Sequence, residues 1–256
     1  MDRRRSRLAR SPPRVNEPTA LPRRDYRDHV AAIRRSRLHP RRRDDLYLHL
    51  SRLRDDVAAA IDRLAGPDVL DVFCGARPYE PLFATGTNYV GFDIDDAYGC
   101  ADVVSDEFLP FPDSSFDLCL CTQAFYFLPD PSVAVAELER VLRPGGRVVL
   151  TVPVVYPGTE RLYSALQLRE LFRGWDDVRI VENGGTAISI VTLSNYFLHQ
   201  IEKRLPHWLR PLFSLLYLGL NTTGELADMF ERRYLESASK LPANLLLRAT
   251  RPSARH

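Results

Sequence analysis

The sequence has few cysteines and no long apolar run, and each of these two shortages argues against a class of protein. Lysine is also almost absent. Its four cysteines form no C-x-x-C pair and have no histidine cluster beside them, so neither a zinc site nor a disulfide framework is indicated. No apolar stretch reaches the roughly 18 residues that a membrane-spanning helix needs, and the first residues contain no apolar signal core. We therefore expect a cytoplasmic protein with reduced thiols and no metal.

Arginine supplies 33 of the 35 basic residues, and they are unevenly placed. Residues 1–43 hold 15 Arg against 4 acids, whereas the remainder holds 20 basic and 29 acidic residues. The first 24 residues contain four Pro and eight Arg but few large apolar groups, which predicts a disordered tail. Such an arm is typical of contact with nucleic acid or an anionic membrane surface, or of a solvated tail in an Arg-rich protein.

The most informative stretch is 68–95, where two apolar runs end at sharp polar stops. Residues 69–73 predict a buried strand that runs into a turn at Gly75, and residues 88–92 predict a second strand that stops at Asp93. Pro78 would start a helix between them, as in a strand-helix-strand unit. A carboxylate at the end of the second strand can accept hydrogen bonds from both hydroxyls of a ribose, so Asp93 is the first candidate binding residue.

A dinucleotide site is less well supported than a nucleoside site. The pyrophosphate-binding pattern G-x-G-x-x-G requires three glycines after the first strand, and this turn has only Gly75. The turn still brings backbone close to a ligand that carries no phosphate.

The rest of the chain alternates apolar runs of strand and helix character. This alternation predicts an α/β fold with a mostly parallel sheet covered on both faces. The predicted strands are 69–73, 88–92, 101–104, 116–121, 147–152, 178–182 and 244–250. The predicted helices are 44–65, 132–142, 160–172, 187–203, 208–220 and 225–239.

Five short motifs, in order over about 85 residues, carry a resemblance. They read C-G-A-R-P-Y-E-P-L-F, Y-V-G-F-D-I, L-P-F-P-D-S-S-F-D, P-D-P and R-V-L-R-P-G-G-R. Together they resemble the class I S-adenosylmethionine-dependent methyltransferases, in the branch called type 11. The resemblance implies a doubly wound, Rossmann-like sheet of seven strands, with S-adenosyl-L-methionine as cofactor.

The resemblance also implies roles for individual residues. Asp71, Phe73, Gly75 and Ala76 would frame the loop beneath the methionine part of the cofactor. Asp93 would hold the ribose hydroxyls, and Ile94 would lie against the adenine. Asp106 would accept a hydrogen bond from the adenine amino group, and Glu107 would lie beside it. Thr122 and Gln123 would face the methionine part and the acceptor. For Asp93 and Asp106 the alternative is capping of the following loop, and for Thr122 and Gln123 it is a purely structural role.

Three departures from the family pattern stand out. Phe73 and Arg77 occupy positions that are usually small, and Phe73 would pack against the cofactor or, more simply, fill the core. Tyr126-Phe127 stands where many relatives have Glu-His, so no imidazole is expected there to take a proton. The stretch after Pro153 lacks the branch's His and Asp-Tyr-x-Arg segment. The sequence therefore assigns no catalytic base, although the tyrosines at 126, 156 and 163 are candidates.

Residues 186–241 read as a helical insertion before the last strand, either a lid over the acceptor or a patch that extends the core. Its longest apolar run, 212–220, predicts a buried helix or one that lies on a membrane surface. We accordingly divide the chain into a tail (1–24), a helical segment (25–66), a cofactor-binding core (67–185), the insertion (186–241) and a last strand with its tail (242–256).

The function expected from these features is transfer of a methyl group from S-adenosylmethionine to a small-molecule or lipid-linked acceptor, with oxygen as the expected accepting atom. Peripheral membrane contact is a further interpretation, and the oligomeric state is not indicated. An RNA methyltransferase that uses the basic arm is the alternative, but neither an N-P-P-Y signature nor a Pro-Cys nucleophile follows the fourth strand, so nucleic acid is not the favoured partner. A third interpretation is a non-catalytic scaffold that keeps the fold.

Overall fold

The computed structural model describes residues 23–61, 68–155, 161–235 and 241–253. Its centre is a seven-stranded sheet in the order β3-β2-β1-β4-β5-β7-β6, in which β7 runs antiparallel to its two neighbours. The strands are β1 (Asp68–Val72), β2 (Asn88–Asp93), β3 (Val103–Val104), β4 (Phe116–Thr122), β5 (Leu142–Pro153), β6 (Asp176–Asn183) and β7 (Asn244–Thr250). The predicted class I, Rossmann-like fold is confirmed.

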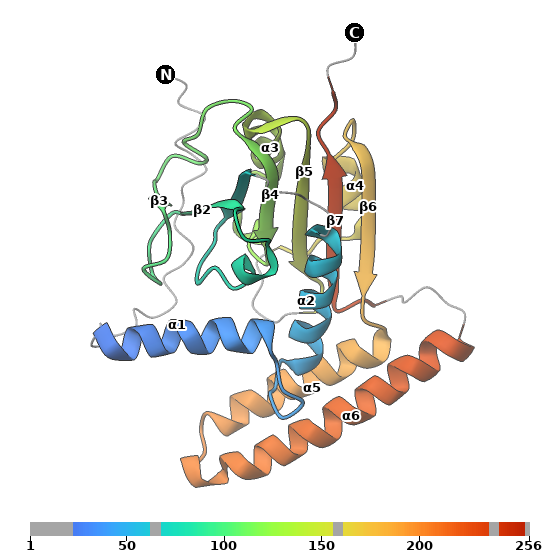
Figure 1. Ribbon diagram of the computed structural model, residues 1–256. Coiled ribbons are helices and arrows are strands. Elements are labelled where there is room, and N and C mark those ends of the chain that lie inside the picture. Colours follow the sequence, from blue (N-terminus) through green and yellow to red (C-terminus); the bar gives the residue numbers. More distant parts are fainter. Residues whose placement is uncertain (1–22, 62–67, 156–160, 236–240, 254–256) are drawn as a thin grey trace.

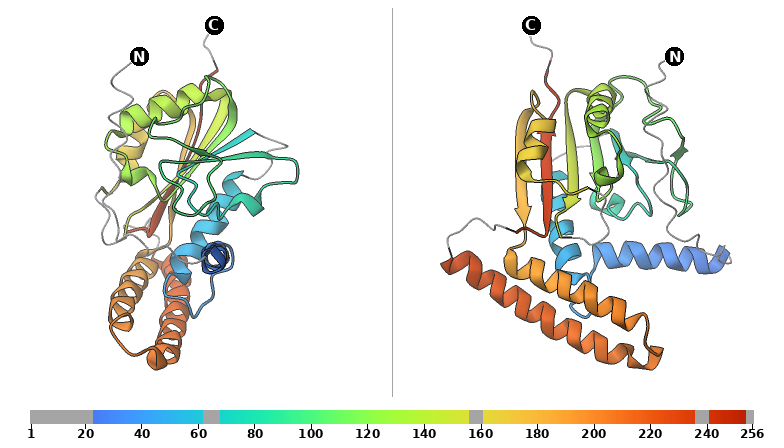
Figure 2. Two further views of the ribbon diagram at one scale, coloured as in Figure 1. Left: turned by 90° about the vertical axis from the view of Figure 1, so that its left-hand side faces the viewer. Right: turned by 180° about the vertical axis from the view of Figure 1, so that it is seen from behind.

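Helices cover both faces of the sheet and its carboxyl edge (Figures 1 and 2). Helices α3 and α4 lie on one face and α2 on the other, while α1, α5 and α6 lie across the end where the parallel strands finish. The helices are α1 (Arg23–Leu38), α2 (Tyr47–Ile61), α3 (Pro131–Val141), α4 (Ala165–Leu171), α5 (Thr186–Glu202) and α6 (Arg210–Tyr234). Short 3₁₀ turns are η2 (Glu80–Leu82), η3 (Phe125–Phe127) and η4 (His207–Leu209). No helix in these described ranges is long and apolar enough to cross a membrane.

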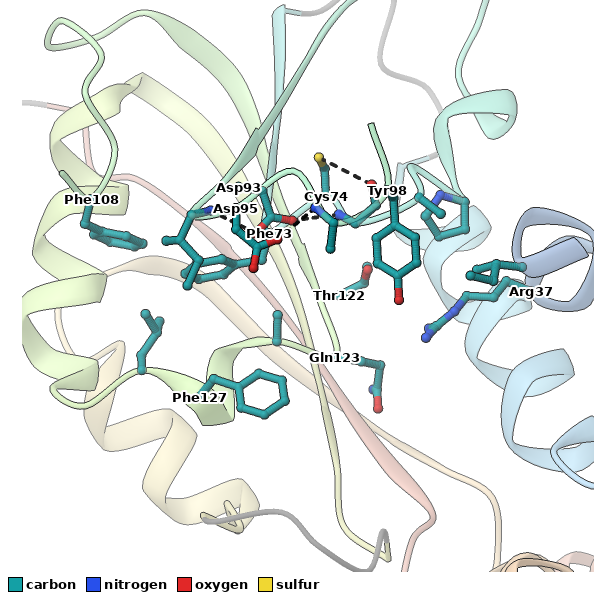
Figure 3. A pocket seen from close by; sticks show the side chains of 18 of the residues that line it. Arg37, Phe73, Cys74, Asp93, Asp95, Tyr98, Phe108, Thr122, Gln123 and Phe127 are labelled. Carbon is teal, nitrogen blue, oxygen red and sulfur yellow. Dashed lines mark hydrogen bonds between the residues drawn. The ribbon is translucent and has the colours of Figure 1, made fainter. Parts of the chain in front are cut away.

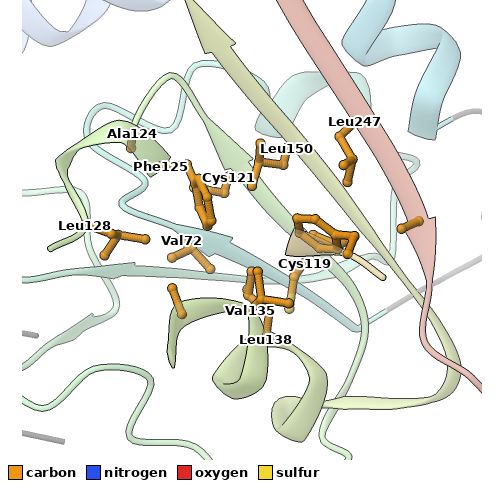
Figure 4. Packing of buried hydrophobic residues seen from close by; sticks show 14 of the residues in the cluster. Val72, Cys119, Cys121, Ala124, Phe125, Leu128, Val135, Leu138, Leu150 and Leu247 are labelled. Carbon is orange, nitrogen blue, oxygen red and sulfur yellow. The ribbon is translucent and has the colours of Figure 1, made fainter. Parts of the chain in front are cut away.

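Alternation along the central strands produces two hydrophobic cores. Leu70 and Val72 of β1 point toward α3 and α4, in the cluster of Figure 4, whereas Val69 points toward α2. On β4, Cys119 belongs to the first core and Leu118 to the second, as the two-residue period of a strand requires. A sheet with both faces buried is rigid, so its strand ends hold loops in fixed positions.

Two expectations about local structure are wrong. No α-helix follows Pro78: the described residues between β1 and β2 contain only the 3₁₀ turn η2. Arg77 adopts a left-handed φ of 50° and Tyr79 is fully buried, so the chain tucks its aromatic ring against the sheet within a few residues. The strand expected at 147–152 begins earlier, at Leu142, and the pairing of β5 with β4 shifts register between Leu142 and Arg147.

The helical insertion contains two helices rather than the expected three. The segments predicted at 208–220 and 225–239 join into the single helix α6, and Gly224 lies inside it. A Cβ at Gly224 would lie 2.8 Å from Leu48 Cδ1 and 3.1 Å from Val191 Cγ2. Gly224 therefore allows α6 to pack closely on α2 and α5, and it does not end a helix.

Candidate functional site

A pocket opens where β1, β2 and β4 end, and α1 covers it (Figure 3). Every one of these strands contributes the residues just past its carboxyl end, where ligands bind in open α/β sheets. The pocket is lined by Ile33, Arg37, residues 73–76, Pro78, residues 93–95, Ala97, Tyr98, Asp106, Phe108, residues 122–124, Phe127 and Leu128.

The loop after β1 has the shape of a glycine-rich turn although only one of its residues is glycine. Phe73, Gly75 and Arg77 have φ values of 59°, 51° and 50°, in the left-handed region that favours glycine. Phe73 stacks on Phe108 with ring centroids 5.9 Å apart and also lines the pocket. Phe73 therefore packs on the core, as one of the two explanations expects, and contact with the cofactor, which is the other, stays a prediction.

Arg77 holds this loop against its neighbours. Its guanidinium lies 2.7 Å from an oxygen of Asp102 and 2.9 Å from one of Glu80, and it also donates to the carbonyl of Tyr89 at 3.1 Å. Arg77 is only 12% exposed, although the carboxylates of Asp102 and Glu80 are 47% and 38% exposed. These bonds give a physical reason why a long side chain stands at position 77.

Asp93, the first candidate binding residue from the sequence, lines the pocket at the end of β2. Its Oδ2 accepts a hydrogen bond from the Gly75 backbone N–H at 3.0 Å, and its Oδ1 accepts one from Ile94 N–H at 2.9 Å. Burial raises the pKa of this carboxyl, and the two N–H donors partly oppose that effect. Each oxygen keeps a second lone pair for a ligand hydroxyl.

The other predicted residues fall into two groups. Those that line the pocket are Phe73, Gly75, Ala76, Asp93, Ile94, Asp106, Thr122 and Gln123. Asp71 and Glu107 are not among the lining residues. Asp71 is buried below the loop, where it accepts from the Tyr89 hydroxyl at 2.5 Å and where burial raises its pKa to about 7. The Glu107 backbone N–H donates to Ser105 Oγ, on the outer side of the loop after β3.

A chain of buried polar groups supports Gln123. Its Nε2 donates to Thr151 Oγ1 at 3.3 Å and to Asn244 Oδ1 at 3.2 Å, and Asn244 Nδ2 lies 3.2 Å from His49 Nδ1. Burial lowers the pKa of His49 to about 4, so this imidazole is neutral near pH 7. Sequence reasoning missed His49 and Asn244, because they belong to α2 and β7, far from the motifs.

Sequence reasoning also missed α1, which supplies Ile33 and Arg37 to the pocket. Tyr98, whose ring lies 3.7 Å from the position of a Cβ on Gly75, was missed as well. The apolar spacing of α1 is weak and its charge is high, so no pattern connected it with the site. None of the lining residues comes from α5 or α6, and the idea of a lid over the acceptor stays a prediction.

The tyrosines considered as bases lie elsewhere. Tyr126 packs against the Phe127 ring, with centroids 4.1 Å apart, and is not a lining residue. Tyr163 is buried against Phe125, and burial raises its pKa. Tyr156 lies outside the described residues. No histidine is among the described residues that line the pocket, and no group of three metal-ligating side chains occurs in the described ranges.

Comparison with known proteins agrees with this geometry. Residues 70–150 match the model of a methyltransferase domain family. The chain is 27% identical over 176 residues to 27-O-demethylrifamycin SV methyltransferase of Amycolatopsis mediterranei, a match that covers 60% of each protein. The chain spans only about half to three fifths of the length of the first curated relatives that it matches (49% and 60%).

Two solved structures share the fold at low sequence identity. The [4+2]-cyclase SpnF superimposes with a TM-score of 0.52 at 20% identity, over 90% of this chain and 94% of that one. A phosphoethanolamine N-methyltransferase of Haemonchus contortus, in complex with phosphomonomethylethanolamine and S-adenosylhomocysteine, gives a TM-score of 0.51 at 16% identity, over 92% of this chain and 61% of that one. The comparisons therefore show that residues 70–150 are similar to a methyltransferase domain and that the chain shares the fold of these solved structures.

Proposed function

We propose that this chain transfers a methyl group from S-adenosylmethionine to a small-molecule or lipid-linked acceptor, at an oxygen atom. The observation that carries the proposal is the pocket, which gathers Asp93, Asp106 and Gln123 from three separate strand ends around one cavity. Structural roles as loop caps do not require these side chains to share a cavity, whereas a nucleoside ligand does.

The charge of the pocket suits this cofactor. Its charged lining residues are Asp93, Asp95, Asp106 and Arg37, so carboxylates outnumber guanidinium groups by three to one. S-adenosylmethionine carries a sulfonium and an ammonium group against one carboxylate, and is therefore a net cation. A dinucleotide would bring a pyrophosphate into the same negative field, which agrees with the lack of a G-x-G-x-x-G pattern.

The lining residues fit the parts of the cofactor one by one. Asp93 would accept from the ribose hydroxyls, and Asp106, which is exposed at the pocket edge, would accept from the adenine amino group. Ile94 and Phe73 present apolar surface for the adenine ring. The loop at 73–76 and Gln123 would border the methionine part, as the family resemblance implies.

When bound, the cofactor supplies an electrophilic methyl group on a sulfonium whose leaving group is a neutral thioether. The protein therefore has mainly to hold acceptor and methyl in line and to exclude water, and orientation alone can contribute about 7 to 11 kcal/mol. No lining residue is assigned as a base, so an acceptor that ionises readily, such as a carboxyl or a phenol, is favoured over a sugar hydroxyl.

The acceptor is expected on the side of the pocket that α1 and η3 form. Ile33 and Leu128 line that side, together with Phe127, whose side chain is 44% exposed although it is a large apolar ring. An acceptor with an apolar portion would cover these groups. The curated relative that acts on 27-O-demethylrifamycin SV supports oxygen as the accepting atom.

A combined binding and turnover assay tests the proposal. Titration calorimetry measures binding of S-adenosylmethionine and S-adenosylhomocysteine, and a radiolabelled-methyl assay screens fatty acids, acyl-carrier-protein thioesters, phenols and lipid-linked sugars. We expect binding at one site and transfer to a member of the acidic oxygen classes. Binding without transfer to any acceptor would support the scaffold interpretation, and absence of binding would refute the proposal.

A further inference from the structure

Helix α6 buries polar residues and exposes apolar ones. The side that packs against the protein carries Asn221, Gly224 and Asp228, together with the rings of Phe213 and Tyr217. Its solvent side carries large apolar side chains, each more than two fifths exposed: Leu212, Leu215, Leu216, Leu226, Met229, Phe230 and Tyr234. These residues form two groups, 212–216 and 226–234, and helical geometry places both groups on the same face of α6.

The polar residues on the inner side have specific partners. Asn221 donates to the carbonyls of Arg42 and Asp44 at 2.9 Å each, and its Oδ1 accepts from Asn195 Nδ2 at 2.8 Å. Asp228 accepts from the Gly185 N–H at 3.0 Å and is only 2% exposed. These bonds fix which face of α6 points inward, so the exposure of the leucines is a consequence of the fold.

The acidic residues of the hairpin formed by α5, η4 and α6 (186–234) are also engaged by the protein. Glu202 accepts from the Tyr217 hydroxyl at 2.8 Å, and Glu225 accepts from the Tyr47 hydroxyl at 2.8 Å. Glu231 accepts from the Thr186 and Ala187 N–H groups at the start of α5. With Asp228, these are all four acids of residues 186–234.

Three basic residues of the hairpin, in contrast, lie near the turn between the helices, whereas Arg232 at the other end of α6 pairs with Asp228. Lys203, Arg204 and Arg210 are exposed and make no ion pair with any carboxylate in the described part of the chain. We call residues 203–216 the hairpin tip. It contains three cations, no acid, and five exposed apolar side chains: Leu205, Trp208, Leu212, Leu215 and Leu216.

The exposed apolar surface of the hairpin is large for a protein that meets only water. Trp208 is 68% exposed, and Phe197, Phe230 and Tyr234 are 65%, 58% and 65% exposed. From the usual area of an aromatic side chain, these four alone present on the order of 500 Å². This area is distributed along the hairpin, from Trp208 beside the start of α6 to Tyr234 at its end, and Trp208 is the aromatic ring that lies at the turn between the helices.

We propose that the hairpin tip docks this protein on the surface of an anionic lipid bilayer, with Trp208 and the leucines in the interface and the three cations at the lipid phosphates. Cations around an exposed tryptophan and leucines are the composition of interfacial amphipathic helices. A second copy of the chain fits the tip less well, because an isologous contact would bring cations onto cations with no outward acid of the hairpin to pair them.

Docking would place the pocket close to the membrane. The hairpin and α1 both lie across the carboxyl edge of the sheet, which is also the edge where the pocket opens (Figures 1 and 2). This proposal does not depend on methyl transfer, because the tip shares no residue with the pocket.

Vesicle sedimentation tests the proposal with the full chain. Vesicles of phosphatidylcholine alone are compared with vesicles that contain phosphatidylglycerol. Two tip variants are used: W208S/L212S removes two apolar anchors, and K203Q/R204Q/R210Q removes the three cations. Two controls carry the same kinds of change on exposed residues far from the tip, L162S/L166S and R169Q/R173Q/R179Q.

We expect binding to anionic vesicles only. The cation variant should lower the partition coefficient about a hundredfold, because each basic group near an anionic surface contributes about fivefold. W208S/L212S should lower it at least tenfold, and both controls should stay within threefold of the unmodified chain. The arginine-rich segment 1–22 is the same in every variant, so a difference between them reports on the tip.

A local readout and the oligomeric state complete the test. Trp208 fluorescence should shift to shorter wavelength when anionic vesicles are added, whereas the other tryptophan, Trp175, is already buried. Equal binding by all variants, or no binding to anionic vesicles, would overturn the proposal. Sedimentation equilibrium that shows a dimer in the unmodified chain and a monomer in W208S/L212S, without vesicle binding, would assign the face to a second copy.

Discussion

Removal of the Asp93 carboxylate should abolish most cofactor binding while the fold survives. The carboxylate would accept from two ribose hydroxyls, and a hydrogen bond to a charged group is worth about 1.5 to 3 kcal/mol. Each Asp93 oxygen already accepts one backbone N–H, from Gly75 or Ile94, so the lower value applies to each hydroxyl. Asp93→Ala should therefore weaken binding by about 3 kcal/mol, or roughly 150-fold, and Asp93→Asn by about half that free energy, or roughly tenfold.

The effect on stability should be small because two contributions oppose each other. The alanine variant loses the acceptor for the Gly75 and Ile94 N–H groups, which destabilises the loop. It also removes a carboxylate whose pKa is raised by burial, which means that the ionised form is disfavoured in the folded state near pH 7. Removal of that charge stabilises the folded state and so opposes the first contribution. We expect the melting temperature to change by only a few degrees, as for Asp55→Ala, an exposed acid outside the pocket.

Calorimetric titration with two ligands separates a direct contact from an indirect one. S-adenosylhomocysteine is compared with an analogue that lacks both ribose hydroxyls. If Asp93 contacts the ribose, the unmodified chain should bind the analogue about as weakly as Asp93→Ala binds either ligand. Equal losses for both ligands on mutation would refute the ribose contact, and an unchanged affinity in a folded variant would remove the site assignment.

Three further substitutions, one of them with a matched control, test other parts of the account. Gly224→Ala should lower the free energy of unfolding by about 1 to 3 kcal/mol, because its Cβ would overlap a buried leucine of α2 at 2.8 Å. Gly219→Ala in the same helix has open space and should raise it by about 0.8 to 1 kcal/mol; equal effects in urea unfolding would contradict the packing argument. The raised pKa of Asp71 means that, between about pH 4 and about pH 7, the unmodified folded state holds a proton that the unfolded chain has lost, so the unmodified chain loses stability as pH rises through that window. Asp71→Asn has no such carboxyl and should therefore gain stability relative to the unmodified chain over the same window, by a few kcal/mol in total. Parallel urea-unfolding profiles of the two proteins over that range would show that Asp71 does not titrate as described. Ile33→Ser should raise the KM for an apolar acceptor at least fivefold while the cofactor Kd stays within twofold, and a change confined to the cofactor Kd would place Ile33 against the cofactor instead.

Much of the sheet could be predicted because its signals are local. Alternating apolar runs set the strands, and Asn244–Thr250 was predicted with its observed bounds. Asp93 could be predicted because the end of a parallel strand has a fixed relation to the ligand edge. The methyltransferase family could be recognised because five motifs occur in order.

The remaining features depend on contacts between segments far apart in the sequence. Gly224 reads as a helix stop, and only the approach of α2 and α5 shows that it is a close-packing site. The support of Gln123 by Asn244 and His49 joins residues up to 195 positions apart. Helix α1 lies almost entirely in the segment 25–66, which was predicted to be helical, but nothing in its residue pattern indicates that Arg37 lines the pocket.

The most direct test of the central claim is equilibrium binding of S-adenosylmethionine to the purified chain. The account predicts saturable binding at one site per chain, competition by S-adenosylhomocysteine, and loss of that binding in Asp93→Ala but not in Asp55→Ala. Absence of saturable binding by a folded protein, or binding that is equal in both variants, would contradict it.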